Sequence, residues 1–323
     1  MISFRFHLVS ITAVFLAIAI GVVVGSTYVD RAVVENLERR IDTVSGNLDE
    51  RKQQNDDLER DLDDVRSYIT ASADFAVTDR LLDVPVLILA MRGVDGEAAQ
   101  EIGLLARRAG GIVPGVVWVE RKWSLESDDD RAALAGVIGA GERDSVSRLQ
   151  ALAWAAVVDE LRVPPMPDAD PAGPPTTAPP TTQVLADLQS SGFLTVDALD
   201  DASTTLAGLR GTSPRVVVVA GSQQDEQLEA VVAMVISAQV GAGLPTVAAE
   251  VFREETDGPA RAELLRDAIP EEQRDRVVIV DHADQPEGRV ASVIALAAAA
   301  EGLVGHFGYG SDSDGVLPGW TPP

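Results

Sequence analysis

The first 70 residues show two hydrophobic patterns in succession, and the first is an uncharged apolar run at residues 8–25. A helix needs about 20 mostly apolar residues to cross the roughly 30 Å hydrocarbon core of a bilayer. Phe4, Phe6 and Tyr28 can lengthen the run at the two membrane interfaces. The pattern therefore predicts a short cytoplasmic tip and a transmembrane helix within residues 1–28.

A cleaved signal peptide is the alternative interpretation of this run. Its apolar region is about 7 to 15 residues long and ends in a small-residue cleavage site. The run here is longer, and residues 25–27 are a poor site of that kind, which favours an uncleaved anchor. Arg5 precedes the run, whereas Asp30 and Glu35 follow it. The excess of basic residues on cytoplasmic sides of membranes then predicts a single-pass plasma-membrane protein with the bulk of the chain extracytoplasmic.

Two glycines inside the apolar run, Gly21 and Gly25, form a GxxxG pair. Such a pair lets two membrane helices approach closely. The pair therefore predicts a contact between membrane helices, and the alternative is simply two small residues in an apolar helix.

A heptad pattern follows the apolar run. With Val34 as position a, alternating steps of three and four residues reach eleven positions, of which nine are apolar. These positions are Val34, Leu37, Ile41, Val44, Leu48, Arg51, Asn55, Leu58, Leu62, Val65 and Ile69. A pattern sustained in this way predicts a coiled-coil stalk over residues 30–72, with a seam about 54 Å long at 1.5 Å per residue.

Two positions of this seam are polar, and they bear on its partner. Asn55 falls at an a position and Arg51 at a d position. A buried Asn at a costs stability but fixes the register and favours two strands. The narrow seam favours a partner helix, from a second copy or from another envelope protein, and the alternative is a helix packed on its own globular domain.

Beyond the stalk, short β-branched runs alternate with longer amphipathic stretches. Strands are expected at residues 84–90, 112–119, 215–220, 244–249 and 276–281, and helices at 97–109, 131–138, 145–161, 225–240, 260–268 and 287–303. This alternation predicts one α/β domain over residues 80–304, with a mainly parallel sheet flanked by helices. The proline-rich stretch 163–182 is expected to be a solvated insertion. Residues 305–323 are expected to form a flexible, Gly-rich acidic tail.

Composition narrows the classes of partner. The chain has 323 residues, 26 Lys plus Arg and 51 Asp plus Glu, for a net charge of −25. Such acidity argues against binding nucleic acid. The chain contains no cysteine, so disulfides and thiolate metal sites are excluded.

Candidate ligand-binding residues come from the strand ends, because open α/β sheets bind ligands beyond the carboxyl ends of their strands. The residues expected there are Arg92, Asp95, Gly221, Ser222, Asp281 and His282. Gly221 and Ser222 precede a predicted helix and could hold an anion at its N-terminus. An ordinary turn with a capping side chain is the favoured interpretation. Asp281 and His282 are adjacent, but neighbours on a strand point in different directions, so we expect no dyad.

Catalytic and metal-binding motifs are not found in the sequence. There is no GxGxxG after a strand, no GxxxxGK[ST] and no GxSxG, so neither an enzyme nor a cofactor is predicted. Ser222 with His282 as nucleophile and base is a weak alternative. His7, His282 and His306 are scattered along the chain, whereas copper(I) needs clustered thiolate, thioether or imidazole ligands. No metal site is therefore expected.

The two ends of the chain together resemble a known family. The opening residues 1–26, MISFRFHLVSITAVFLAIAIGVVVGS, and the closing residues 305–310, GHFGYG, are similar to the actinobacterial copper transporter family typified by mycobacterial copper transport protein B. The order of anchor, coil and α/β domain matches over essentially the whole chain. The resemblance implies a cell-envelope protein linked to copper efflux or resistance, described for some members as a channel-forming outer membrane protein.

The same resemblance implies an alternative function. It implies kinship with corynebacterial envelope proteins that pair with a cytoplasmic partner and help control peptidoglycan hydrolases during cell separation. In that case the chain is a non-enzymatic scaffold whose stalk binds its partner. The family provides no catalytic motif that can be transferred to residues of this chain.

We predict that the N-terminal segment stays attached as a signal anchor. The uncharged run is long enough to span the bilayer and lacks a clear cleavage site. The intact mass of the protein extracted from membranes should therefore include residues 1–25. A mature chain that begins near Ser26 would contradict this prediction.

Overall fold

A computed structural model describes residues 4–141, 143–162, 183–199, 206–222, 224, 228–253 and 261–319, without the side chains of residues 26–34. The predicted insertion at residues 163–182 lies outside the described residues. The chain divides into two units, Met1–Val65 and Arg66–Pro323.

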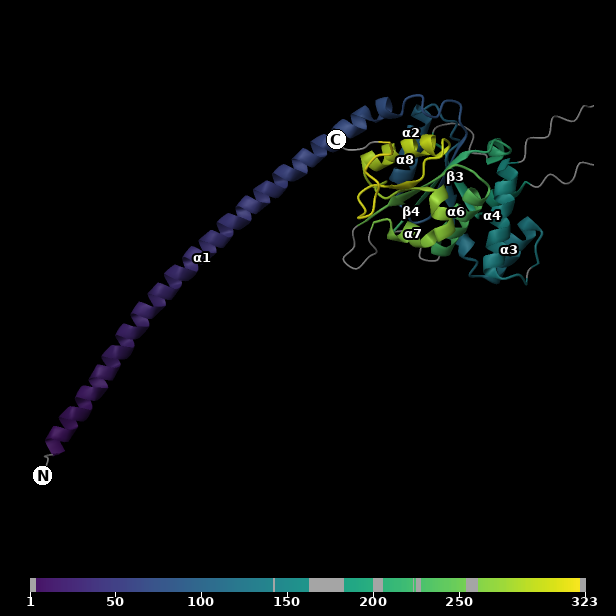
Figure 1. Cartoon of the computed structure of the whole chain (residues 1–323). Coiled ribbons are helices and arrows are strands. Elements are labelled where there is room, and N and C mark those ends of the chain that lie inside the picture. The colour runs from purple at the N-terminus through teal and green to yellow at the C-terminus, as the bar shows by residue number, and fades with distance from the viewer. Residues whose placement is uncertain are drawn as a thin grey trace, which may run out of the picture. The chain divides into compact units, whose positions relative to one another are not determined.

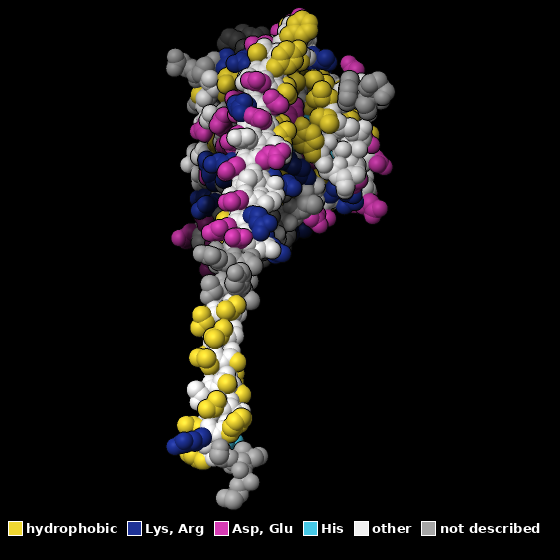
Figure 2. Space-filling model, turned by 90° about the vertical axis from the view of Figure 1, so that its left-hand side faces the viewer, with side chains coloured by type: hydrophobic (Ala, Val, Ile, Leu, Met, Phe, Trp, Pro, Cys, Tyr) yellow, Lys and Arg dark blue, Asp and Glu magenta, His cyan; other side chains and the backbone are white. Residues whose placement is uncertain are grey.

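The first unit consists of the N-terminal part of helix α1, which spans Phe4–Val77. Its Phe4–Gly25 segment is apolar and exposed throughout, and it is long enough to cross a membrane. Figure 2 shows hydrophobic side chains without acidic ones along this segment, and interspersed acidic and basic side chains farther along the helix. The apolar segment supports association of the chain with a membrane.

The last turns of α1 belong to the second unit and join its core. Ala73 and Val77 are buried, as is Leu81 in the following turn. The Arg108 guanidinium also contacts the Asp74 carboxylate at 3.0 Å. These contacts show that the end of α1 is part of the globular unit.

The second unit is built around one sheet of seven strands in the order β3-β2-β1-β4-β5-β6-β7. The strands are β1 (Val86–Met91), β2 (Val116–Val119), β3 (Leu194–Asp197), β4 (Arg215–Gly221), β5 (Thr246–Val251), β6 (Val278–Val280) and β7 (Gly305–Phe307). All neighbouring pairs are parallel except β2 and β3. The predicted α/β fold with a mainly parallel sheet is confirmed.

Helices cover both faces of this sheet (Figure 1). The helices are α2 (Gly96–Arg108), α3 (Asp128–Ile138), α4 (Val146–Arg162), α5 (Val184–Ser190), α6 (Glu229–Gly241), α7 (Glu263–Ala268) and α8 (Pro286–Ala299), with 3-10 turns η1 (Arg121–Ser124), η2 (Leu206–Leu209) and η4 (Glu271–Arg276). Helices α2 and α8 pack together on one face, and α4 and α6 pack together on the other.

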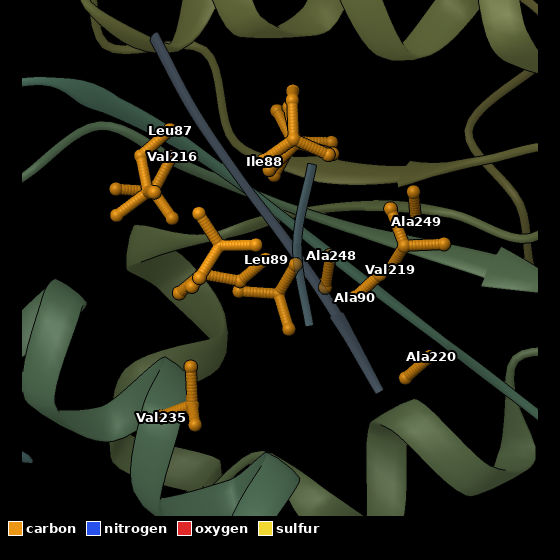
Figure 3. Packing of buried hydrophobic residues seen from close by; sticks show 14 of the residues in the cluster. Leu87, Ile88, Leu89, Ala90, Val216, Val219, Ala220, Val235, Ala248 and Ala249 are labelled. Atoms are coloured by element: carbon orange, nitrogen blue, oxygen red, sulfur yellow. The ribbon is translucent and has the colours of Figure 1, made fainter. Parts of the chain in front are cut away.

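The core follows from the composition of the central strands. Every residue of β1 and β5 is buried, as are all of β4 except Arg215. Figure 3 shows Ile88 and Leu89 of β1 projecting from opposite faces, with Val235 of α6 on the Leu89 side. Strands covered by helices on both faces need apolar residues at nearly every position. This explains why the sequences of these strands are continuous apolar runs and do not alternate between apolar and polar residues.

An aromatic cluster lies near the edge of the sheet that is formed by β2 and β3. Trp123 stacks on Trp154 with ring centroids 4.7 Å apart, and Phe193 meets Trp123 edge-on. The Trp123 indole N–H donates to the carbonyl of Phe193. This cluster brings the segment before β3 against η1, so that β3 adds to β2 as an antiparallel edge strand.

Two expectations from the sequence are wrong in this unit. No strand was expected at residues 194–197, where β3 forms. The segment expected to begin a flexible tail instead begins with β7, which pairs in parallel with β6, and its His306 and Phe307 are buried. The glycines around this short strand obscured its apolar pattern.

Candidate functional site

The residues expected beyond β1 have structural partners. The Arg92 guanidinium pairs with the Glu120 carboxylate, reaches the Thr195 hydroxyl at 3.0 Å and lies over the Trp118 ring. Asp95 caps α2, because its carboxylate accepts from the N–H of Glu97. Both side chains therefore hold the loop after β1 in place.

The residues expected beyond β4 are likewise engaged. A Cβ at Gly221 would overlap the carbonyl oxygen of Val251, so glycine permits the close approach of β4 and β5. The Ser222 hydroxyl accepts from the backbone N–H of Arg253 at 3.2 Å. Ser222 therefore ties together the segments that follow β4 and β5, whereas the favoured expectation was a side chain that caps the following helix.

The structure does not gather the six expected residues into one crevice. The strand order reverses between β1 and β4, so the segments that follow these two strands lie at the switch point of the sheet. Asp281 and His282 follow β6, which is two strands away from β4. The expected site is therefore two separate places along the same edge.

The place beyond β6 is a buried cluster around Asp281. The side chain of His306, from β7, lies with Nε2 2.7 Å from Asp281 Oδ2. His282 Nδ1 lies 3.5 Å from Asp281 Oδ1, which is too far for a well-formed hydrogen bond. Asp281 and His282 therefore approach each other more closely than expected, and the fold brings His306 to the same carboxylate although it is 25 residues from Asp281 in the sequence.

The closing motif of the sequence wraps around this carboxylate. The backbone N–H groups of Tyr309 and Gly310 donate to Asp281 at 2.8 and 2.7 Å. Gly308 has φ +143°, and a Cβ there would overlap the Asp281 carboxylate. The glycines of GHFGYG thus let the backbone approach Asp281, a role that was not deduced from the sequence.

His282 is fully buried in this cluster, and its two ring nitrogens have no hydrogen-bond partner. Its imidazole packs on the Tyr309 ring with centroids 4.9 Å apart. A Cβ at Gly288 would overlap the His282 carbonyl oxygen, so α8 also approaches closely. The imidazole is therefore enclosed on several sides.

Burial and the surrounding polar groups shift the pKa of two carboxyl groups in and near the cluster. Burial alone would raise the pKa of Asp281, but the two imidazoles and the two backbone donors outweigh burial and hold that pKa well below its usual range. Burial raises the pKa of Glu250, on β5, to about 7. The N–H of Ala262 and the Arg261 guanidinium oppose this rise, and the Asp281 charge adds to it.

A groove that the sequence did not indicate lies between α4 and α6. Its volume is about 720 Å³. Trp154, Ala155 and Val158 line it from α4, and Ala233 and Met234 from α6. It contains none of the site residues expected from the sequence.

The predicted stalk residues lie along one exposed stretch of α1. Leu37, Ile41, Val44, Leu48, Leu58, Leu62 and Val65 are 53% to 62% exposed. Ile69 is half-buried in the second unit, and the Val34 side chain lies outside the described part. In the apolar Phe4–Gly25 segment, a Cβ added at Gly21 or Gly25 would have no neighbouring atom within 4 Å. Within the described chain this apolar seam has nothing to cover it.

Among the described residues, no group of three or more His, Asp or Glu side chains is arranged to hold a metal ion. The Asp281 cluster is instead arranged as a set of donors that converge on one carboxylate.

Comparisons with known proteins cover nearly the whole chain. A family model described as "Copper transport outer membrane protein, MctB" matches residues 1–318. Proteins named copper transporter MctB from Mycobacterium bovis and from two strains of Mycobacterium tuberculosis are each 26% identical over 316 residues. These matches cover 96% of this chain and 97% of each relative.

Replacing Asp281→Asn should lower the free energy of unfolding by about 3 kcal/mol. The Asn side chain lacks the negative charge that the surrounding donors stabilise in Asp281. Its NH₂ group must also face one of these donors, which then has no acceptor. Chemical denaturation of the full-length protein measures the change. Asp312→Asn is the matched control. Asp312 is half exposed, pairs with the Arg266 guanidinium and lies 3.7 Å from His306 Nδ1, and the loss of such a partly exposed ion pair should cost less than about 1 kcal/mol. Equal losses in the two variants would contradict the central role of Asp281.

Glu250→Gln should remove a dependence of stability on pH. With a folded-state pKa of about 7 and an unfolded value of about 4.3, the folded protein binds an extra proton between these values. The native chain therefore loses stability as the pH rises from about 4.5 to 7, and the loss is complete above pH 7. Gln keeps an acceptor for the Ala262 N–H but carries no proton. Melting temperatures at pH 5 and pH 8 should differ less in the variant, and an unchanged difference would show that Glu250 is ionised at both values.

Proposed function

The chain belongs to the family described as copper transport outer membrane protein, MctB, and on that premise we propose that it takes part in copper efflux or resistance at the cell envelope. The observation that carries the proposal is the extent of the family match, residues 1–318. The match includes both the apolar segment of α1 and the globular unit. The likeness to proteins named copper transporter MctB supports the same proposal.

The apolar Phe4–Gly25 segment supports a single-pass anchor. Arg5 before it, and Asp30 and Glu35 after it, support an orientation in which the globular unit is outside the cytoplasm. In this arrangement an acidic α/β domain stands outside the plasma membrane at the end of a helical stalk.

The proposed role is not enzymatic. The strand-end residues that sequence reasoning offered for chemistry hold loops together, because Arg92 pairs with Glu120 and the Ser222 hydroxyl bonds with the Arg253 backbone. The Asp281 carboxylate is occupied by its ring of donors. Because these side chains are already engaged in structural contacts, we favour a role in binding or assembly over catalysis.

The chemistry of the residues limits how copper would be handled. Copper(I) prefers soft ligands such as thiolate, thioether or clustered imidazoles. The chain has no cysteine, and the imidazoles of His282 and His306 are buried around Asp281. The role therefore fits transport or tolerance by an assembled complex better than tight storage in one globular unit.

A strain that lacks this chain should grow less well than its parent in copper-containing medium and should accumulate cellular copper. The full-length chain should restore growth. Ala17→Asp should fail to restore it, because a charge at the centre of the span costs about 2.5–3.5 kcal/mol on insertion, whereas Ala17→Leu should succeed. Growth inhibition by zinc is the control for a general envelope defect.

Equal copper tolerance and equal copper content with and without the chain would overturn the proposed copper role. If the same strain instead showed a defect in cell separation, the alternative of a scaffold that regulates peptidoglycan hydrolysis, with a possible cytoplasmic partner, would replace it. Copper content, measured beside cell morphology, therefore distinguishes the two functions.

A further inference from the structure

We infer that two copies of the chain pair in parallel and in register along the stalk, and that the same face of the helix continues into the membrane span. The observation behind this inference is the exposed seam of α1. Its seven apolar residues from Leu37 to Val65 are each more than half exposed. The inference concerns the partner of the stalk and is independent of the copper role.

The membrane anchor fixes the direction of pairing. Helix α1 is one continuous helix from Phe4 through the span to Val77. Two copies anchored in the same membrane enter it from the same side, so their stalks leave it in the same direction. A self-associated stalk is therefore parallel, and an antiparallel pair is excluded by the anchors.

Polar seam residues fix the register. In a parallel pair without an offset, Asn55 faces Asn55 of the second copy, and an Asn at position a favours two strands in this alignment. Arg51 also faces its own copy, which weakens the middle of the seam. An offset of one heptad would bury both residues against apolar partners at additional cost.

Charges beside the seam agree with this alignment. In a parallel pair, each g position lies beside the e position five residues later on the other copy. The four pairs between Arg40 and Arg66 are Arg40–Ser45, Asn47–Lys52, Gln54–Glu59 and Asp61–Arg66. None joins like charges, and the last joins opposite charges. The flanks of the seam therefore contain no like-charge pair that would oppose a second copy of the same chain, and one pair that would favour it.

The continuous helix also decides which face of the span meets the partner. At 100° per residue, the 16 residues from Gly21 to Leu37 turn the helix by about 160° beyond complete turns. Gly25 and Ile41 are separated by the same angle. The Gly21–Gly25 face thus points away from the seam. The heptad register is interrupted by the polar residues Thr27 and Asp30 and becomes apolar again in the span at Leu16, Ile20 and Val23. The glycine pair is therefore available to a different membrane neighbour.

Single cysteines test the pairing, because the native chain has none. Full-length chains carrying Val44→Cys or Leu58→Cys should be converted by an oxidant, in membranes, to a disulfide-linked product of twice the chain mass. Arg60→Cys, at the outward f position, is the matched control and should remain largely single. In the span, Val23→Cys should crosslink more than Gly25→Cys, which lies at a similar depth.

The same set of variants can overturn the inference. A product at Leu58→Cys whose mass is not twice that of the chain would identify a different partner helix. Crosslinking at only one of Val44→Cys and Leu58→Cys would exclude the in-register alignment. Stronger crosslinking at Gly25→Cys than at Val23→Cys would exclude a shared face for stalk and span.

A charge exchange at Arg51 tests the register by a second route. In the inferred pair, a chain with Arg51→Glu should associate with the native chain more strongly than either associates with itself, because opposite charges then meet at the seam. Two differently tagged chains, expressed together and captured through one tag, measure this preference. An unbiased mixture of pairs would mean that the two Arg51 positions do not face each other.

Discussion

The hydrogen-bonded continuity of α1 is the constraint on which the arrangement of this chain depends. Because each residue of a helix advances the face by a fixed angle, the apolar Phe4–Gly25 segment and the stalk that follows it present their side chains in a fixed angular relation along one helix. Fully burying a Val or Leu side chain contributes about 1.5–3 kcal/mol. Leaving a buried polar group without a partner costs about 1–3 kcal/mol. The gain from burying the seven apolar side chains of the seam therefore exceeds the cost of burying Arg51 and Asn55, which favours a seam covered by a partner helix.

In the globular unit, one buried carboxylate has a comparable organising effect. Asp281 draws together β6, the imidazole on β7 and the backbone of the closing segment. This arrangement gives a physical meaning to GHFGYG. Glycine is needed where the chain passes against the carboxylate, and the histidine supplies a side-chain donor. In this chain, the closing motif that resembles the copper transporter family forms the edge strand β7 and the backbone donors to Asp281.

The sequence predicted the elements whose pattern is local and strong. The uncharged span, the long helix and the β-branched runs of β1, β4 and β5 were recognised because each is apolar over its whole length or at a regular spacing. β3 and β7 were missed because short edge strands depend on partners far along the chain. The Asp281 cluster could not be deduced either. Its partner His306 is 25 residues away, and only the parallel pairing of β6 with β7 brings the two side chains together.

Family membership and the available side chains together favour assembly as the basis of function. One apolar helix cannot enclose a path through a membrane by itself, so a transport role requires several spans, from copies of this chain or from other proteins. The described residues provide no clustered metal ligands, and the imidazoles of the globular unit are buried around Asp281. The feature suited to bringing spans together is the seam, which is largely apolar, exposed and free of like-charge pairs across its flanks in a parallel pairing.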